Sequence, residues 1–277
     1  MEAQEHVRAG DVNAALNALQ DQVRAEPSEA RHRVFLFQLL SILGQWDRAL
    51  TQLNVAGEMD AANLGMAQVY RQALAVESMR EEVFAGKRTP LIFGDPEQWI
   101  ALLFEALKLS AAGEIAQSED LRGEALELSP ATSGRLNDRE FEWIADADSR
   151  MGPMIEAIIN GRYFWVPFNH VWEMRIDEPE DLRDLVWVPA EFKWTNGGEA
   201  VALIPARYPG SEGSDDPRVQ LGRMTTWEDH GNDFYTGLGQ RMLATDAEEC
   251  PILDVRNVVI DQPDAAGDAD ADPTSDG

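Results

Sequence analysis

Two aspartates separated by one residue form a carboxylate pair that could hold a metal ion. Asp146 and Asp148 precede Arg150, and further carboxylates follow within residues 246–249. Carboxylates spaced this way on a loop can share a hard cation. The sequence shows no histidine nearby, no nucleophile motif and no phosphate-binding glycine loop, and 50 Asp and Glu residues place acids together by chance. We therefore interpret the pair as turn or cap residues, or as charge partners of Arg150 and Arg162, and expect no catalytic residue, metal or cofactor.

The other reactive side chains also lack the spacing of a catalytic or metal site. The single cysteine, Cys250, excludes an intramolecular disulfide and a cysteine-based zinc site, and its acidic neighbours do not activate a thiol. We therefore expect a binding protein rather than an enzyme, in a reducing, cytoplasmic setting. No H-x-x-x-H spacing occurs among the four histidines, His6, His32, His170 and His230.

The charge of the chain indicates which partners it can bind. The formal net charge is −27, and the acidic side chains are spread over the whole sequence. Such a surface repels phosphate, so we expect neither nucleic acid nor an anionic membrane as a partner, whereas a basic or amphipathic protein segment would be attracted. The simpler interpretation of any one acidic patch is solubility. The longest apolar run, residues 34–43, is far shorter than a membrane span, and no secretory signal is visible.

Glycines recur at the period of a tetratricopeptide repeat. Gly10 and Gly44 lie 34 residues apart, and a third copy begins at Gly113. The first and third copies share a gap of 17 residues from this glycine to a proline. Such helix pairs bury their apolar faces by stacking, so we expect each glycine to separate two helices of a pair. Unrelated amphipathic helices are the alternative. The middle copy lacks its glycine and is interrupted by helix-breaking residues at 86–96.

The second half of the sequence has the composition of a sheet. Six of the eight tryptophans follow Pro130, in short segments rich in Val, Ile, Phe and Tyr that are bounded by Gly, Pro and Asn. Gly197-Gly198 supplies a hairpin turn. One helix is expected at residues 153–160. The expected strands are residues 141–144, 162–167, 170–176, 186–194 and 199–204.

Together these patterns predict an α+β fold. A tetratricopeptide-like helical repeat domain is expected at residues 1–130, and a tryptophan-rich, mainly antiparallel β domain at residues 131–260. Residues 261–277 form an acidic tail that is expected to be disordered, because its composition offers almost no apolar side chain to bury.

Long strings of this sequence are similar, in the same order, to a known family. The similarity runs from about residue 9 to residue 256 and rests on strings such as VFLFQLLSILGQWDRALTQL and FEWIADADSRMGPMIEAIINGRYFWVPF. The strings that carry it are residues 34–53, 88–99, 141–168, 181–212 and 238–256. The chain resembles the ImpE/TagJ accessory family of the bacterial type VI secretion system, also called SciE-type virulence proteins.

The resemblance implies a non-enzymatic cytoplasmic protein with a protein partner. Members of the family bind the N-terminal helix of the small contractile-sheath subunit, TssB, and so associate with the sheath that the ClpV ATPase recycles. The acidic tail lies outside the resemblance. A generic tetratricopeptide-like scaffold or chaperone for another protein is the alternative, and a metal-dependent hydrolase that uses the β domain is a third hypothesis.

The helical repeats indicate where such a partner helix could bind. Stacked helix pairs expose a groove formed mainly by the first helix of each pair, and amphipathic helices bind in such grooves. Apolar residues at this spacing are often ordinary core residues, so the polar candidates are the stronger ones. The candidate partner-binding residues are Arg31, Val34, Gln38, Ser41, Leu103 and Leu107, with Ile100 and Ser110 on the same face.

Overall fold

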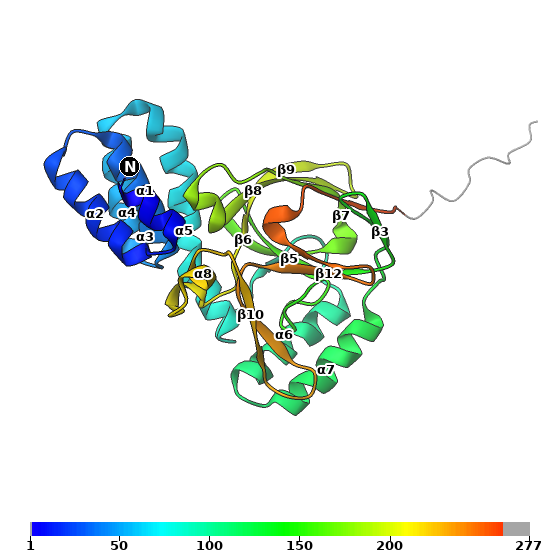
Figure 1. Ribbon diagram of the computed structural model, residues 1–277. Coiled ribbons are helices and arrows are strands. Elements are labelled where there is room, and N and C mark those ends of the chain that lie inside the picture. Colours follow the sequence, from blue (N-terminus) through cyan, green and yellow to red (C-terminus); the bar gives the residue numbers. More distant parts are fainter. Residues whose placement is uncertain (1, 263–277) are drawn as a thin grey trace, which may run out of the picture.

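A helical half followed by a half built of strands makes up the protein (Figure 1). The computed structural model describes residues 2–262, and this order of elements confirms the α+β fold. None of the described helices is long and apolar enough to cross a membrane. The helices are α1 Glu2–Ala9, α2 Val12–Ala25, α3 Ala30–Ile42, α4 Trp46–Met59, α5 Leu64–Phe84, α6 Gln98–Ala111, α7 Ile115–Leu128 and the short α8 Pro217–Gln220.

A glycine in the left-handed region joins the two helices of each predicted pair. Gly10, Gly44 and Gly113 have φ angles of 84°, 64° and 84°, and they lie between α1 and α2, α3 and α4, and α6 and α7. Residues with a Cβ rarely adopt this conformation, so glycine recurs at the turn. Asp11 then begins α2 by accepting the backbone N–H of Ala14. The helix pairs predicted from the glycine period are confirmed.

These pairs do not form one continuous stack. The single 21-residue helix α5 is followed by residues 85–97, which contain two prolines and the short strand β1 Leu91–Ile92. Because β1 pairs in parallel with strand β6 Arg162–Pro167, this segment lies against the sheet and ends the helical stack. Figure 1 shows α1 to α4 together at one end of the molecule and α6 with α7 as a separate pair.

Most strands belong to one sheet of nine strands in residues 2–262, with the order β1-β6-β5-β9-β8-β7-β14-β2-β3. A three-stranded sheet, β13-β12-β4, and the hairpin β10-β11 complete the strand half. The remaining bounds are β2 Gly134–Leu136, β3 Arg139–Phe141, β4 Ile144–Asp146, β5 Met154–Ile159, β7 Val171–Ile176, β8 Trp187–Trp194, β9 Glu199–Pro205, β10 Thr225–Asp229, β11 Tyr235–Gly239, β12 Met242–Thr245, β13 Glu249–Pro251 and β14 Asn257–Ile260.

Four of the five predicted strands, now β6 to β9, are confirmed to within one residue at each end. Gly197-Gly198 joins β8 to β9 as predicted, and Gly197 has a φ of 82°. The fifth prediction, one strand at residues 141–144, is wrong, because β3 ends at Phe141 and β4 begins at Ile144. Two short strands of different sheets therefore share this stretch.

The helix predicted at residues 153–160 is also wrong, because this segment is strand β5. All six residues of β5 are buried, since neighbouring layers cover both faces of the sheet. A strand of this kind is a continuous apolar run without alternation, and periodicity alone cannot distinguish it from a buried helix. Asn160 and Gly161, with φ of 50° and 72°, form the tight turn into β6.

An apolar core lies on each face of the large sheet. On one face, Trp165 packs against Phe84 of α5 and Phe104 of α6, with ring centroids 5.5 and 5.4 Å apart. Trp187 packs against aromatic rings of α4 and α5 on the same face. The other face packs against side chains of β4, β12 and β13. The core on the first face joins the helices to the sheet without interruption.

The predicted division at residue 130 falls between α7 and β2, and it stays a prediction. The shared core crosses this boundary, because side chains from α1 to α7 and from β5, β6 and β8 belong to one apolar cluster. Most of the predicted acidic tail, residues 263–277, lies outside the described residues.

We expect the shared core to make unfolding cooperative. Thermal unfolding followed by circular dichroism at a helix wavelength and by tryptophan fluorescence should give coincident transitions, since six tryptophans lie in the strand half. Two separate midpoints would show that the helical and strand halves unfold independently and would contradict a common core.

Candidate functional site

The Asp146 and Asp148 carboxylates are buried and bound to arginines. Asp148 accepts the Arg150 guanidinium at 2.8 and 2.5 Å, which confirms one predicted charge partner. The second predicted partner is wrong, because the Arg162 guanidinium lies over an aromatic ring of its own strand. Asp146 binds Arg241 instead. The pair therefore forms fixed ionic contacts inside the protein.

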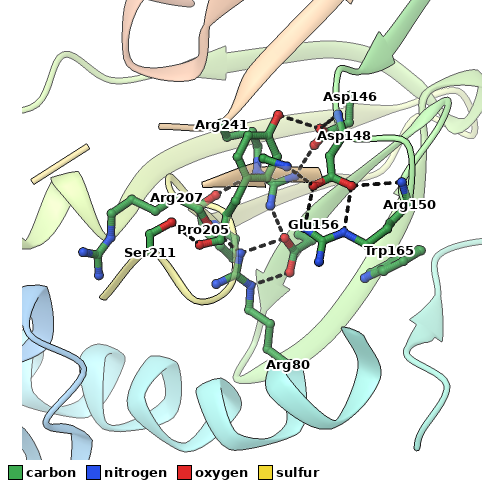
Figure 2. Close-up of polar contacts among 12 residues, drawn as sticks. Arg80, Asp146, Asp148, Arg150, Glu156, Trp165, Pro205, Arg207, Ser211 and Arg241 are labelled. Atoms are coloured by element: carbon green, nitrogen blue, oxygen red, sulfur yellow. Dashed lines mark hydrogen bonds and ion pairs between the residues drawn. The ribbon is translucent and has the colours of Figure 1, made fainter. Parts of the chain in front are cut away.

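Figure 2 shows the wider ion network that joins α5 to the sheet. Arg80 of α5 donates to both carboxylate oxygens of Glu156 on β5, at 2.6 and 3.0 Å. Arg241 binds this same carboxylate as well as Asp146. The Tyr163 hydroxyl donates to Glu156 at 2.5 Å. All five side chains are buried, and a further buried carboxylate, Glu77 of α5, lies 3.5 Å from Arg80.

The pKa values of these carboxylates reflect burial and their arginine partners. Burial favours the neutral form of Glu156, but Arg80 and Arg241 outweigh it and hold the pKa of this carboxyl below its usual range. Burial raises the pKa of Asp146 to about 6, against the opposing effect of Arg241. Residues 2–262 contain no group of three or more His, Cys, Asp and Glu suited to a metal ion. The network acts as a structural link between helices and sheet.

Two arginines of the strand half bind the C-terminal ends of α1 and α3, each of which is the first helix of its pair. Arg207 donates to the last two carbonyl groups of α3, at 3.3 and 2.9 Å. Arg223 donates to the carbonyl groups of Val7 and Arg8 near the end of α1, at 3.0 and 3.1 Å. A helix end carries unpaired carbonyls and partial negative charge, which a guanidinium satisfies. The carbonyls at residues 7 and 8 lie 34 residues before those at 41 and 42, so both arginines bind equivalent repeat positions.

Arg207 also connects the end of α3 to the ion network. Arg80 donates to the backbone carbonyl of Arg207 at 2.6 Å. Burial lowers the pKa of Arg207 to about 10, so its guanidinium stays charged at neutral pH. The position of α3 is therefore fixed relative to both α5 and the sheet.

A groove runs along α3, and we call it the α3 groove. Its two adjoining parts have volumes of about 480 and 580 Å³ and share Gln4 and Phe35. The helices α1, α2 and α3 and residues 179–185 of the strand half contribute to it. The lining residues are Gln4, Val7, Arg8, Gln22, Glu26, Arg31, His32, Phe35, Gln38, Pro179, Glu180, Asp181, Leu182 and Leu185.

The segment 179–185 is held in place by its own charged side chains. Arg183 lies over the Tyr70 ring of α5, 5.0 Å from the centroid, and contacts the Met66 sulfur at 2.8 Å. Asp184 accepts two backbone N–H groups from the start of the segment, at 2.9 and 2.8 Å. Because of these contacts the strand half supplies a fixed wall of the α3 groove.

The α3 groove contains two of the predicted partner-binding residues. Arg31 is exposed at one end, and Gln38 contributes a side chain that is 6% exposed. Val34 is half-buried on α3 outside the lining residues. Ser41 is buried, and its hydroxyl donates to the backbone carbonyl of Phe37 at 2.9 Å.

The structure does not bring the two candidates of α6 to this groove. Leu103 and Leu107 are 1% and 4% exposed and belong to the core. The reason is the interruption after α5, which places α6 and α7 apart from α1 to α4 (Figure 1). Their role in partner binding stays a prediction.

Sequence reasoning missed Phe35 and the segment 179–185. Phe35 follows Arg31 by four residues and precedes Gln38 by three, so helical spacing alone could have identified it as part of the same face. The segment 179–185 gives no such signal, because it reaches α3 only through the folding of the strand half.

The fold defines a class of protein in which helical repeats are fixed to a mainly antiparallel sheet. Residues 138–259 match the family described as ImpE protein. The chain is 48% identical over 265 residues to the type VI secretion system accessory component TagJ of Pseudomonas aeruginosa, covering 96% of this chain and 93% of that protein. The chain belongs to the ImpE family, as the resemblance predicted.

A crystal structure shows the same fold. Protein VPA1032 from Vibrio parahaemolyticus is similar with a TM-score of 0.86 at 26% sequence identity. The similarity covers 96% of this chain and 99% of that chain, so it includes both the helical and the strand half.

We expect the Arg80 contact to contribute strongly to stability. Arg80→Leu leaves the buried Glu156 carboxylate with one arginine partner in place of two and should lower the free energy of unfolding by about 3 kcal/mol. Urea denaturation followed by tryptophan fluorescence measures this loss. The control Arg24→Leu removes an exposed ion pair with Asp21 and should change stability little. Equal effects of both variants would contradict a structural role of the network.

Proposed function

We propose that this chain is a non-enzymatic accessory protein of a bacterial type VI secretion system. In this proposal it binds the N-terminal helix of the small contractile-sheath subunit, a TssB-like protein, and through it associates with the sheath and the ClpV ATPase. Family membership supports the accessory role, because a relative 48% identical over nearly the whole chain bears that name. The proposal includes a cytoplasmic location, with which the single, buried cysteine agrees.

The α3 groove is the observation that carries the partner-binding part of the proposal. Its parts extend from Arg31 to Gln38, two turns of α3 and about 10 Å along the helix axis. Val7, Phe35 and Leu182 supply apolar surface. This combination suits an amphipathic helix that places two or three apolar side chains into the groove.

The rim of the groove carries both signs of charge. One part of the lining carries Arg8 with Glu180 and Asp181, and the other carries Arg31 with Glu26. A helix with both acidic and basic side chains beside its apolar face would satisfy such a rim. Opposed charges of this kind contribute more to orientation and association rate than to affinity.

The contacts of the buried carboxylates support a binding role over catalysis. Glu156, Asp146 and Asp148 are each bound by an arginine, and these pairs lie inside the protein. A general acid or base needs a carboxyl that can reach a substrate. The groove itself places Glu26 and Glu180 at exposed positions without a neighbouring nucleophile among its lining residues.

We expect a double change in the α3 groove to abolish helix binding. Arg31→Glu with Phe35→Ala removes a cation and an apolar anchor, and anchors of this kind are worth about 2 kcal/mol, or roughly 30-fold in affinity. Titration of a labelled synthetic peptide with the sequence of the sheath subunit's N-terminal helix, followed by fluorescence anisotropy, measures the loss.

The matched control is Arg24→Glu, which makes the same charge change at a side chain 72% exposed, against 74% for Arg31. Circular dichroism confirms folding of each variant. Leu107, although a predicted partner-binding residue, is unsuitable for such a variant, because a charged residue there would disrupt the core. If the peptide binds wild type and the folded double variant equally, the site lies elsewhere. If it binds neither, a generic scaffold for another protein becomes the better assignment.

A further inference from the structure

A second pocket lies where α7 meets the strand half, and we call it the seam pocket. It has a volume of about 440 Å³. Its walls come from α7, from the connection at residues 129–132, from β4 with the residues that follow it, and from Gly152 and Pro153. α7 lies away from α1 to α4, so the seam pocket is separate from the α3 groove (Figure 1).

The seam pocket exposes large apolar side chains. Trp143 is 43% exposed and Leu126 is 39% exposed, and both line the pocket. By contrast, Trp165 and Trp187 are fully buried in the core. Exposed apolar side chains that gather at a concave site, in contrast to scattered ones, mark interaction surfaces. Tryptophan is also among the residues that contribute most to protein interfaces.

The polar groups deep in the seam pocket are already paired. Asp146 and Asp148 line it, and their carboxylates are bound by Arg241 and Arg150. Arg122 also lines the pocket and binds a glutamate of its own helix at 2.8 and 2.6 Å. A ligand inside the seam pocket therefore contacts apolar side chains and charged groups that are already paired with opposite charges.

Exposed carboxylates border the seam pocket, and we call them its acidic rim. Glu127 follows Leu126 on α7, and Glu142 precedes Trp143. Asp246 accepts the backbone N–H of Glu142 at 2.7 Å. These three residues adjoin lining residues without lining the pocket themselves, all three are exposed, and among residues 2–262 none of them forms an ion pair. Their uncompensated charge attracts cations and repels anions.

We propose that the seam pocket binds a basic amphipathic segment of a partner protein. Its apolar side chains contact Trp143 and Leu126, and its lysine or arginine side chains pair with the acidic rim. A second copy of this chain does not fit, because its net charge is −27 and two acidic surfaces would repel each other. Nucleic acid is excluded for the same electrostatic reason. This assignment goes beyond sheath-helix binding in the α3 groove and does not depend on it.

The test uses a model peptide and the full chain. The probe is a fluorescein-labelled 18-residue helix with leucine at positions spaced i, i+3, i+4 and i+7 and lysine at the others, and a second peptide carries glutamate in place of lysine. Fluorescence anisotropy gives affinity at low and high salt. We expect the lysine peptide to bind, the glutamate peptide to fail, and added salt to weaken binding.

Two tryptophan variants separate the seam pocket from general attraction to an acidic protein. Trp143→Ala should weaken binding of the lysine peptide about tenfold or more. Trp172→Ala is the matched control, because Trp172 is 45% exposed and lies on β7 outside the pocket. It should bind like wild type. Leu126→Ala gives a second, independent change inside the pocket, and thermal unfolding confirms that each variant is folded.

The outcomes also separate this proposal from the proposed function. The weakening caused by Trp143→Ala should be the same in the wild-type chain and in the chain with Arg31→Glu and Phe35→Ala, because the α3 groove and the seam pocket share no lining residue. Equal affinities of the Trp143→Ala and Trp172→Ala variants, or equal binding of the two peptides to wild type, would overturn the assignment of the seam pocket. If the α3-groove variant lost only the binding of the sheath-subunit peptide, the assignment of the seam pocket would still hold.

Discussion

Arginine side chains of the strand half hold the ends of two repeat helices, and the candidate binding surface depends on this contact. Arg207 binds the end of α3 and Arg223 binds the end of α1, at positions one repeat apart. Their bonds are to backbone carbonyls, so the contact recognises the geometry of the repeat rather than its side chains. The spacing between α1 and α3, and with it the width of the α3 groove, is set by the strand half.

The ion network around Glu156 fixes the position of α5 relative to the sheet. Arg80 joins α5 to β5, and its second bond to the Arg207 carbonyl connects the network to the end of α3. Apolar side chains could hold helices against the sheet with similar stability. We interpret the ions as a device for alignment, because the bonds between Arg80 and both carboxylate oxygens of Glu156 require a defined position of α5 on the sheet. The repeats and the sheet are thereby joined into one body that carries the α3 groove and the seam pocket at separate places.

Local patterns were readable in the sequence, and contacts between distant segments were not. The glycine period predicted the helix pairs because each turn needs a left-handed residue. Strand β5 was mistaken for a helix because burial on both faces removes the alternation that marks a strand. Glu156 pairs with residues 76 and 85 positions away, and no spacing rule indicates such partners. Of the predicted partner-binding residues, Arg31 and Gln38 line the α3 groove, whereas Leu103 and Leu107 of α6 lie in the core. The sequence indicated the interruption at residues 86–96 but not that it would separate α6 from α3 in space.

Amide hydrogen exchange on an arginine variant tests most directly whether the strand half fixes the repeat helices. Arg223→Met removes the bonds to the end of α1 and leaves every lining side chain of the α3 groove unchanged, although the two carbonyls that lose their partner belong to the lining residues Val7 and Arg8. We expect exchange in α1 to become at least about tenfold faster, exchange in α4 to stay unchanged, and the sheath-subunit peptide to bind more weakly. Unchanged protection in α1 together with unchanged peptide affinity would contradict the account, because the repeats would then keep their spacing without the arginine.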